Sequence, residues 1–484
     1  MKRLFLFLVS ALSVLRLAGA APECVFEHYS SLDGLPHNAV LDIYHDRQGF
    51  LWICTWYGLS RFDGYTFKNY QTLPGDCSPL THNRFFKVTE DALGYLWVTT
   101  YDNKLFRFDR NREQFTDVVR ASEKLAGTSF KVSRYLNASG HDTWIALEEA
   151  GLIRVTSGPD GEVNVTDYFD NEEIGKKITG LFEEKNGRIW VVSETGIACL
   201  SPSEKDYDIS LFSSASDVSS IVEMDRFVCF GAGTELLVLD KRTGRVTRLH
   251  VCENDRIAAL EKSPDHETLY IGTARSGIVI YTPRDGRTER AAGCPGRLRE
   301  MVADSKGLVW VTTSSTGIVR FDPRTKSYKH FVHERNAVPY YNDSVTKIVE
   351  RNGVLWIKMN RFGFGYYDRK RDEVRPFYNV PSLGETSARM TNAITCFEVD
   401  PNNVLWLSTY SRGLTKGTII QRQVSLLAPD KHPENMASNE IRALCRDRDG
   451  HLWLGTKTGN LFCYDSRFRQ LHRFPEEGDR KSVV

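Results

Sequence analysis

At 484 residues, 41% of them hydrophobic and 26% charged, the chain has the composition of a soluble globular protein and the length of two or three domains. Its 63 basic residues balance 62 acidic ones for a formal net charge of +1, which excludes the basic excess typical of nucleic-acid-binding proteins. We therefore expect no nucleic-acid partner.

The first twenty residues have the pattern of a signal peptide. Lys2 and Arg3 precede an apolar run from Leu4 to Leu15, and small residues at 18–20 form a cleavage site. A run of about twelve apolar residues is too short for a bilayer span, and no later stretch is longer. The sequence therefore predicts an exported chain whose residues 1–20 are removed.

One pattern then recurs along the whole chain: an apolar run, an Asp-x-x-Gly turn, Leu-Trp-Ile/Val-x-Thr, a Gly-containing turn, and a strand ending near Phe-Asp. Its clearest copy runs from Asn38 to Asp63. The signature position is held by Trp52, Trp97, Trp144, Trp190, Cys229, Tyr270, Trp310, Trp356, Trp406 and Trp453. Ten copies with a period of roughly 40 to 50 residues, each holding four strand-sized segments, predict an all-β fold of β-propeller blades.

The repeat also assigns structural roles. Asp46 and Gly49 punctuate the first hairpin, because Asp hydrogen-bonds its own backbone in turns and Gly tolerates positive φ. The second strand, from Leu51 to Thr55, is apolar on both faces, as expected for a sheet packed between two neighbouring blades. We therefore interpret the signature tryptophans as packing residues and not as a binding site.

Counting blades predicts a domain boundary. The first seven signature positions end at Trp310, and the N-terminal segment 24–29 resembles an outer strand that lacks inner partners. We expect it to complete the seventh blade, so that residues 21–325 form a closed seven-bladed β-propeller and residues 326–484 form the first three blades of a second. Three blades cannot close a ring, and we expect the chain to be the front part of a longer protein or the product of an interrupted gene.

The cysteines give no sign of a metal site. Ten are present, without a CxxC pair or a Cys/His cluster of zinc spacing, and most lie inside apolar strand-like runs, as Cys54 does. We expect buried thiols, no metal and no cofactor.

The repeat resembles the two-component regulator propeller repeat of periplasmic sensors in hybrid two-component systems of Bacteroidetes. The residues that carry the resemblance are Gly34, Leu35, Asn38, Val40, Ile43, Asp46, Gly49, Leu51, Trp52, Ile53, Thr55, Gly58, Leu59, Arg61 and Asp63. In that family two seven-bladed propellers precede a β-sandwich, an inner-membrane span, a histidine kinase, a receiver and a DNA-binding domain. The resemblance implies a periplasmic sensor of glycan-derived oligosaccharides that regulates polysaccharide utilisation.

The resemblance also limits what this chain does. It has no kinase His-box, no nucleotide-binding glycine motif and no receiver carboxylate cluster. Phosphorelay chemistry would thus belong to C-terminal modules that the chain lacks, and we expect no enzyme activity and no catalytic residues here. In the family the propellers dimerise through the sandwich domain, so we expect a homodimer only at full length.

Ligand binding is expected at one mouth of the ring, where the loops between second and third strands lie. Aromatic faces stack on sugars and guanidinium groups bind hydroxyls or carboxylates. The candidate ligand-binding residues are Trp56, Tyr57, Arg84, Tyr101, Arg275, Arg361, Tyr410 and Arg412. Trp56 stands out because it is the one tryptophan outside the signature, whereas ordinary exposed loop chemistry is the alternative interpretation of each of the eight.

A secreted propeller enzyme, such as a glycan lyase or glycosidase, is the alternative function. It needs paired carboxylates, or a His/Tyr pair with a cation, converging on one mouth. Glu148 and Glu149 are adjacent and make a poor pair, and His37 and His82 are isolated loop histidines. A purely structural or partner-binding propeller is a third class, for which the sequence offers no distinctive patch.

Overall fold

The computed structural model describes residues 23–120, 130–158, 161–204, 206–291, 293, 297–313, 317–331, 345–359, 364–377, 394–400, 402, 404–409, 411–420, 429, 439–465 and 468–474. Within these residues the chain forms ten four-stranded antiparallel sheets, so the predicted all-β propeller fold is confirmed. The signal peptide predicted at 1–20 lies outside the described residues. In the described part of the chain, no helix has the length and apolarity that a membrane crossing requires.

Nine of the ten sheets are meanders whose four strands follow chain order, whereas the ninth takes its outer strand from the N-terminus. The first strands are β2 (Val40–His45), β6 (Phe85–Glu90), β10 (Val132–Asn137), β14 (Ile178–Glu183), β18 (Val218–Glu223), β22 (Ile257–Lys262), β26 (Leu298–Ala303), β30 (Val345–Arg351), β34 (Ile394–Val399) and β37 (Ile441–Arg446). The second strands are β3 (Leu51–Thr55), β7 (Leu96–Thr100), β11 (Thr143–Leu147), β15 (Ile189–Ser193), β19 (Phe227–Ala232), β23 (Leu269–Thr273), β27 (Val309–Thr313), β31 (Val354–Met359), β35 (Val404–Thr409) and β38 (Leu452–Thr456).

The outer half of each sheet follows the same scheme. The third strands are β4 (Gly58–Phe62), β8 (Leu105–Asp109), β12 (Gly151–Ser157), β16 (Gly196–Pro202), β20 (Glu235–Asp240), β24 (Ile278–Thr282), β28 (Ile318–Asp322), β32 (Phe364–Asp368), β36 (Gly413–Ile420) and β39 (Leu461–Tyr464). The outer strands are β5 (Phe67–Tyr70), β9 (Gln114–Asp117), β13 (Val163–Asp167), β17 (Tyr207–Ser213), β21 (Val246–His250), β25 (Arg287–Ala291), β29 (Ser327–Phe331), β33 (Glu373–Phe377), β40 (Gln470–Phe474) and the N-terminal β1 (Glu23–Tyr29), which a short 3-10 helix (Ser31–Asp33) follows.

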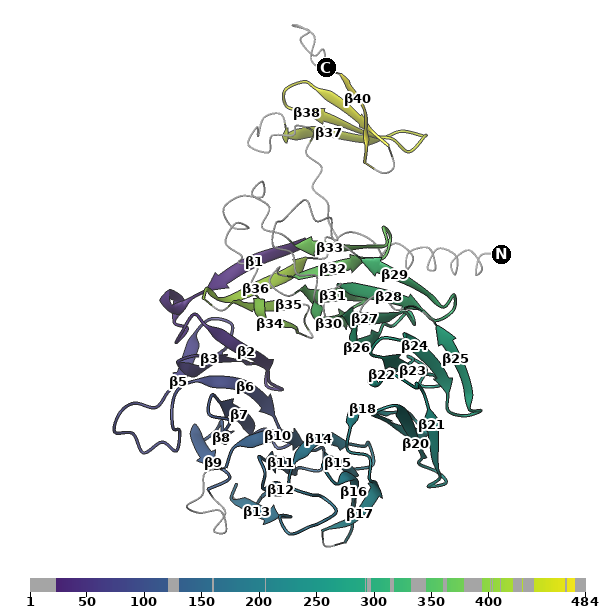
Figure 1. Cartoon of the computed structure of the whole chain (residues 1–484). Helices are drawn as coiled ribbons and strands as arrows, with labels where there is room; N and C mark the ends of the chain where they lie inside the picture. The colour runs from purple at the N-terminus through teal and green to yellow at the C-terminus, as the bar shows by residue number, and fades with distance from the viewer. Residues whose placement is uncertain are drawn as a thin grey trace. The chain divides into compact units, whose positions relative to one another are not determined.

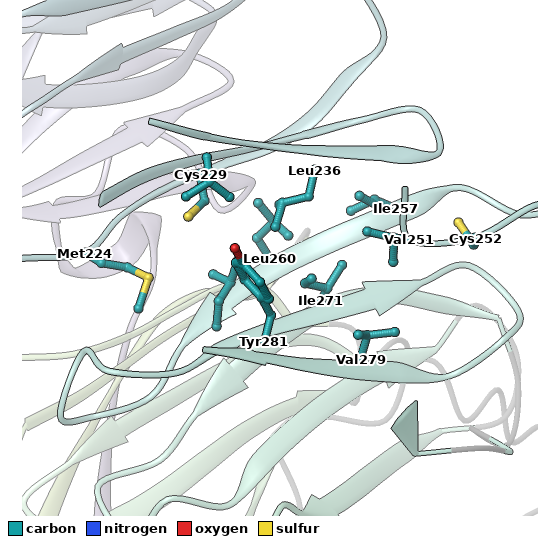
Figure 2. Close-up of a cluster of buried hydrophobic side chains, with 12 residues drawn as sticks. Met224, Cys229, Leu236, Val251, Cys252, Ile257, Leu260, Ile271, Val279 and Tyr281 are labelled. Carbon is teal, nitrogen blue, oxygen red and sulfur yellow. The ribbon is translucent and has the colours of Figure 1, made fainter. Parts of the chain in front are cut away.

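Nine sheets follow one another round a ring, with their first strands on the inside (Figure 1). A separate apolar cluster lies between each consecutive pair of sheets, the ninth and first included. Figure 2 shows the cluster between the fifth and sixth sheets, where Cys229 and Leu236 face Ile271 and Tyr281. The signature tryptophans of these nine sheets are all buried in such clusters, which confirms their interpretation as packing residues.

The turn aspartate does more than shape the hairpin. In the first sheet Asp46 accepts the indole N–H of Trp52 at 2.7 Å and two backbone N–H groups, and it pairs with Arg110 of the second sheet at 2.7 Å. The same carboxylate–indole bond recurs for Trp97, Trp190, Trp310, Trp406 and Trp453. The repeat therefore encodes a side-chain clamp on the tryptophan together with the turn.

Ring closure differs from the sequence-based expectation. The strand β1 pairs with β36 in the ninth sheet, not with the seventh. The outer position of the seventh sheet is taken by β29 (Ser327–Phe331), which pairs with β28, whereas the residues described after β33 supply the ninth sheet with three strands, β34 to β36. The compact units accordingly run 1–419 and 420–484, in place of the expected division into 21–325 and 326–484.

Residues 420–484 contribute the tenth sheet, β37 to β40, which has its own small cluster of Leu454, Phe462 and Tyr464. Eight cysteines in the described residues are free thiols, and five of them are buried, as expected for Cys54. Burial raises the pKa of Cys54 and Cys229, which keeps both thiols protonated and unreactive.

All ten first strands carry the same irregularity. The pairing register shifts just after the first residue of each, for example between Val40 and Asp42, between Phe85 and Lys87, and between Leu298 and Glu300. A bulge places two consecutive residues opposite one residue of the partner strand. Pairs such as Phe86 and Lys87 are thereby both left exposed.

Candidate functional site

Three of the eight candidate residues come together where the first and second sheets meet. The guanidinium carbon of Arg84 lies 4.8 Å from the ring centre of Trp56 and 5.2 Å from that of Tyr101. Both distances are within the range of a cation–π contact. Arg84 is exposed and has no ion pair with any carboxylate in the described ranges, so the two aromatic rings are its main neighbours.

The backbone explains why these side chains meet. Trp56 follows β3, Tyr101 follows β7, and Arg84 directly precedes β6. The N–H of Tyr101 donates to the carbonyl of Arg84 at 3.1 Å, and the N–H of Gly58 donates to the carbonyl of Asn83 at 2.8 Å. Hydrogen bonds from each second-to-third-strand turn to the segment before a first strand thus hold this mouth of the ring together.

A third aromatic residue extends the group inwards. The ring of Phe86 lies 5.7 Å from that of Tyr101, at an angle of 30°, and Phe86 is 40% exposed although it is a strand residue. We call Trp56, Arg84, Tyr101 and Phe86 the mouth row. Tyr101 is 57% exposed and Trp56 is half-buried, and partly exposed aromatic rings are surfaces on which sugar rings stack.

The sequence did not single out Phe86, because simple strand alternation hides it. Phe85 is fully buried and Phe86 and Lys87 are both exposed, a pattern that only the bulge produces. The signal that could have revealed it is the recurrence of two non-core residues at the same place in several first strands, as in Ser133 and Arg134 or Arg299 and Glu300.

Phe86, one residue of the mouth row, also lines a cavity of about 610 Å³ among the first strands, here called the first cavity. Its walls come from the first strands of the second to fifth sheets and from the ends of β7 and β15. The lining residues are Phe86, Lys87, Thr99, Thr100, Asn103, Val132, Ser133, Arg134, Tyr135, Thr179, Gly180, Leu181, Phe182, Val192, Val218, Ser219, Ser220 and Ile221. The hydroxyl groups and two cations among them suit a polar ligand with many hydroxyls.

One carboxylate stands beside the mouth row. Asp102 accepts the hydroxyls of Thr100 at 2.6 Å and Thr81 at 3.0 Å, and His82 and Lys104 lie within 3.5 Å of it. Burial acts to raise the pKa of Asp102, but these hydrogen bonds and the two neighbouring bases lower it below its usual value. Asp102 therefore stays ionised near neutral pH, as a fixed acceptor and not as a proton donor.

The other candidates lie apart from the row or beyond the described residues. Tyr57 is half exposed next to Trp56, and its carbonyl accepts the amide of Gln71. Arg275 is exposed in the sixth sheet, where its backbone N–H binds Asp255, and Arg412 is exposed between β35 and β36. Arg361 and Tyr410 lie outside the described residues.

Two other groups of acidic residues have structural surroundings. Glu149, which is exposed, lies 3.6 Å from Lys177, and the backbone N–H of Glu148 binds the carbonyl of Lys131. Asp447, Asp449 and His451 lie close enough together to hold a metal ion, yet Asp447 already accepts the indole N–H of Trp453 and two backbone N–H groups. That group is the turn of the tenth repeat.

Comparison with known proteins matches the repeat. Residues 34–57 and 435–458 match the family described as Two component regulator propeller. A 57-residue segment is 42% identical to Histidine kinase P4 of Formosa agariphila, a match that covers 12% of this chain and 4% of the kinase.

Solved structures are similar to this chain at low identity. The extracellular domain of a hybrid two component system from B. thetaiotaomicron is 18% identical with a TM-score of 0.37, covering 93% of this chain and 67% of that one. Virginiamycin B lyase from Staphylococcus aureus is 12% identical with a TM-score of 0.35, covering 83% of this chain and all of that one. At such identities and TM-scores neither structure indicates a function. The matched segments identify the repeats, at the first and tenth sheets, as two-component regulator propeller repeats.

Proposed function

We propose that this chain is the extracytoplasmic sensor region of a two-component receptor and that it binds a glycan-derived oligosaccharide at the mouth row and the first cavity. The observation that carries the proposal is the group of Trp56, Arg84 and Tyr101, which Phe86 connects to a cavity of about 610 Å³. The two-component regulator propeller repeats support the receptor context.

The mouth row offers what a sugar ring requires. Its aromatic faces bury the C–H face of a sugar, and Arg84 donates to hydroxyl or ring oxygens while it remains held between two rings. Thr179, Ser219 and Ser220 supply hydroxyls deeper in the first cavity. A ligand of two to four sugar units would thus bind without any chemical change.

The receptor context places the ligand outside the cytoplasm. The leader predicted at residues 1–20 sends the chain to the periplasm, and the sandwich, membrane and kinase modules of a full-length receptor would anchor it in the inner membrane and carry the signal onwards. Dimerisation would come with those modules, and transcription of polysaccharide-utilisation genes would be the output.

Catalytic turnover of a glycan is less well supported than binding. Asp102, the carboxylate beside the mouth row, has a lowered pKa and engages two hydroxyls, so it is a poor general acid near neutral pH. We therefore expect bound oligosaccharides to be released unchanged.

The test measures thermal stabilisation of the purified chain by a panel of neutral oligosaccharides, with a reducing-end assay on the same samples. A binder raises Tm without new reducing ends. Trp56→Ala with Tyr101→Ala should weaken binding at least about tenfold, since each loses a stacking face. Tyr65→Ala is the matched control, because Tyr65 is 92% exposed in the turn between β4 and β5.

Two results would contradict the proposal. The mouth row would not be the binding site if no oligosaccharide of the panel stabilised the chain. The same would follow if the double variant and the Tyr65→Ala control were stabilised equally. Reducing ends that accumulate beyond one per protein molecule would show an enzyme in place of a sensor.

A further inference from the structure

A second cavity of about 540 Å³ lies on the inside of the ring, next to the first. Its lining residues are Asp217, Ser219, Arg256, Ile257, Ala258, Arg297, Leu298, Arg299 and Glu300, from the fifth, sixth and seventh sheets. Ser219 lines both cavities, so the two adjoin. We call this second space the arginine cavity.

The fold places the three arginines at the starts of two neighbouring first strands. Arg256 directly precedes β22, Arg297 directly precedes β26, and Arg299 sits in the bulge of β26. The N–H of Ala274 donates to the carbonyl of Arg256 at 2.9 Å, and the N–H of Leu298 donates to the carbonyl of Ala274 at 3.2 Å. These cross-sheet bonds hold the starts of two neighbouring first strands in register.

The three cavity arginines differ from arginines that form ion pairs elsewhere in the ring. Arg110, Arg226 and Arg369 all form ion pairs with carboxylates at 3.0 Å or less. By contrast, none of the three cavity arginines makes an ion pair within 4.0 Å of a carboxylate in the ranges that the structure describes, although all three are exposed to the cavity.

The nearby acidic groups do not neutralise them. Asp255 is occupied by the backbone N–H groups of Arg256, Arg275 and Ser276, each at 2.8 Å, and these bonds lower its pKa against the opposing effect of burial. Asp217 and Glu300 also line the cavity, at positions from which neither forms an ion pair with its arginines. Guanidinium donors and carboxylate acceptors thus stand in one space without satisfying each other.

The arginines and carboxylates of the arginine cavity match a particular kind of ligand. A guanidinium fork matches a carboxylate or sulfate, and a carboxylate accepts hydrogen bonds from hydroxyl groups. A ligand that carries both an oxyanion and hydroxyl groups therefore complements both kinds of polar group that line this cavity.

We propose that the arginine cavity binds the carboxylate or sulfate group of an anionic oligosaccharide whose neighbouring sugar units extend through the first cavity to the mouth row. This inference rests on the proposed function, because it assigns a substrate class to the same binding surface. In this proposal the mouth row selects for sugar rings, and the arginine cavity selects for the negative charge that they carry.

The test titrates the full chain with two probes by calorimetry: myo-inositol hexasulfate, which presents sulfates on a sugar-sized ring, and trigalacturonate, which presents carboxylates. The variant is Arg256→Gln, Arg297→Gln and Arg299→Gln together. The control is Arg242→Gln, Arg245→Gln and Arg248→Gln, three exposed arginines at the outer edge of the fifth sheet that form no ion pair with a carboxylate among the described residues. Both variants lose three positive charges, so they differ only in where the charges were.

We expect one binding site for at least one probe, weakened about 30-fold or more in the cavity variant and less than about threefold in the control. If the cavity variant weakens binding of the hexasulfate alone, the cavity is a sulfate site. If it weakens binding of trigalacturonate alone, the cavity is a carboxylate site. Either result supports the inference. Equal weakening in both variants, or no binding of either probe to the unmodified chain, overturns it.

The two proposals fail in different ways. If the cavity variant binds both anions normally while Trp56→Ala with Tyr101→Ala abolishes stabilisation by neutral oligosaccharides, the sensor site stands and the anionic substrate class is wrong. If the hexasulfate binds through the three arginines while no sugar stabilises the chain, the anion site stands and the oligosaccharide function is wrong.

Discussion

The tryptophans of the seventh and tenth sheets occupy the same place in the same repeat and differ in what surrounds them. Trp310 is fully buried between the seventh and eighth sheets, among Ile348, Leu355 and Tyr367. Trp453 is only partly buried, and its sheet has a cluster of three residues. Yet both indoles donate to the turn aspartate at 2.9 Å.

The comparison separates what a repeat does alone from what it does with neighbours. The hairpin and its clamp form within about ten residues, so they are present in both sheets. The burial of the strand faces comes from adjoining blades: Leu444 in β37 is 68% exposed, whereas Met301 at the same position of β26 is 6% exposed. Local sequence thus specifies the blade, and the ring supplies most of its stabilisation.

The largest expected effect is that of truncating the two tryptophans. Trp310→Ala should destabilise the ring by about 3–5 kcal/mol, because a filled site between two sheets becomes a cavity. Trp453→Ala should cost about 1 kcal/mol, because that side chain is already in contact with solvent. Hydrogen exchange followed by mass spectrometry reads each sheet separately, and similar losses of protection in both would contradict the comparison.

A second prediction tests how the ring closes. Gly413 has φ +85°, and a Cβ there would lie 2.2 Å from the carbonyl oxygen of Tyr29 in β1. Gly450 of the tenth sheet has φ +86°, but a Cβ added to Gly450 would have no atom within 4 Å. Gly450→Ala should therefore cost about 1 kcal/mol for backbone strain alone, and Gly413→Ala about 3 kcal/mol, because it also displaces β1.

Chemical denaturation of both variants, with exchange at residues 23–29 as a local readout, distinguishes the two glycines. Equal costs with unchanged protection of β1 would show that the N-terminal strand does not pack against Gly413, and would reopen the seven-bladed closure expected from the sequence.

That expectation failed for a physical reason. The turn at Asp46 and Gly49, the buried strand Leu51–Thr55 and the packing role of Trp52 depend on contacts within one repeat and its neighbour, and all are present. Closure depends on which sheet has a vacant edge. Outer strands of similar repeats are interchangeable hydrogen-bonding partners, so the sequence alone could not decide between the seventh and ninth sheets.

The candidate site, like the fold, was predictable from the sequence only in part. Trp56, Arg84 and Tyr101 were expected at one mouth because repeat position determines which loops lie there, whereas their stacking depends on side-chain conformations that a sequence does not show. Phe86 and Arg299 were missed because the bulge breaks strand alternation. Each lies where the regular pattern predicts a core or a neutral position.

The smallest expected effect concerns charge, and it has opposite signs in the two units. Burial raises the pKa of Glu261 in β22 to about 7, against the opposing hydrogen bonds of backbone groups and the charge of Lys262. The folded state therefore binds a proton that the unfolded state releases between pH 4.5 and 7, so stability from this residue is highest in acid and falls as pH rises through 7. In the tenth sheet the indole of Trp453 and the groups of His451 lower the pKa of Asp447 to about 2, so that its contribution is lost only as pH falls through 2.

Glu261→Gln should accordingly stabilise the ring by about 1–2 kcal/mol at pH 8 and change little at pH 4.5, because the amide resembles the protonated acid. Asp447→Asn should instead destabilise the tenth sheet at pH 8, because the amide is a weaker acceptor for the indole N–H. Urea unfolding at both pH values measures the first and local hydrogen exchange the second. If the effect of Glu261→Gln did not depend on pH, the carboxylate would be solvated in the folded ring. The burial of charged groups would then no longer distinguish the ring from the tenth sheet.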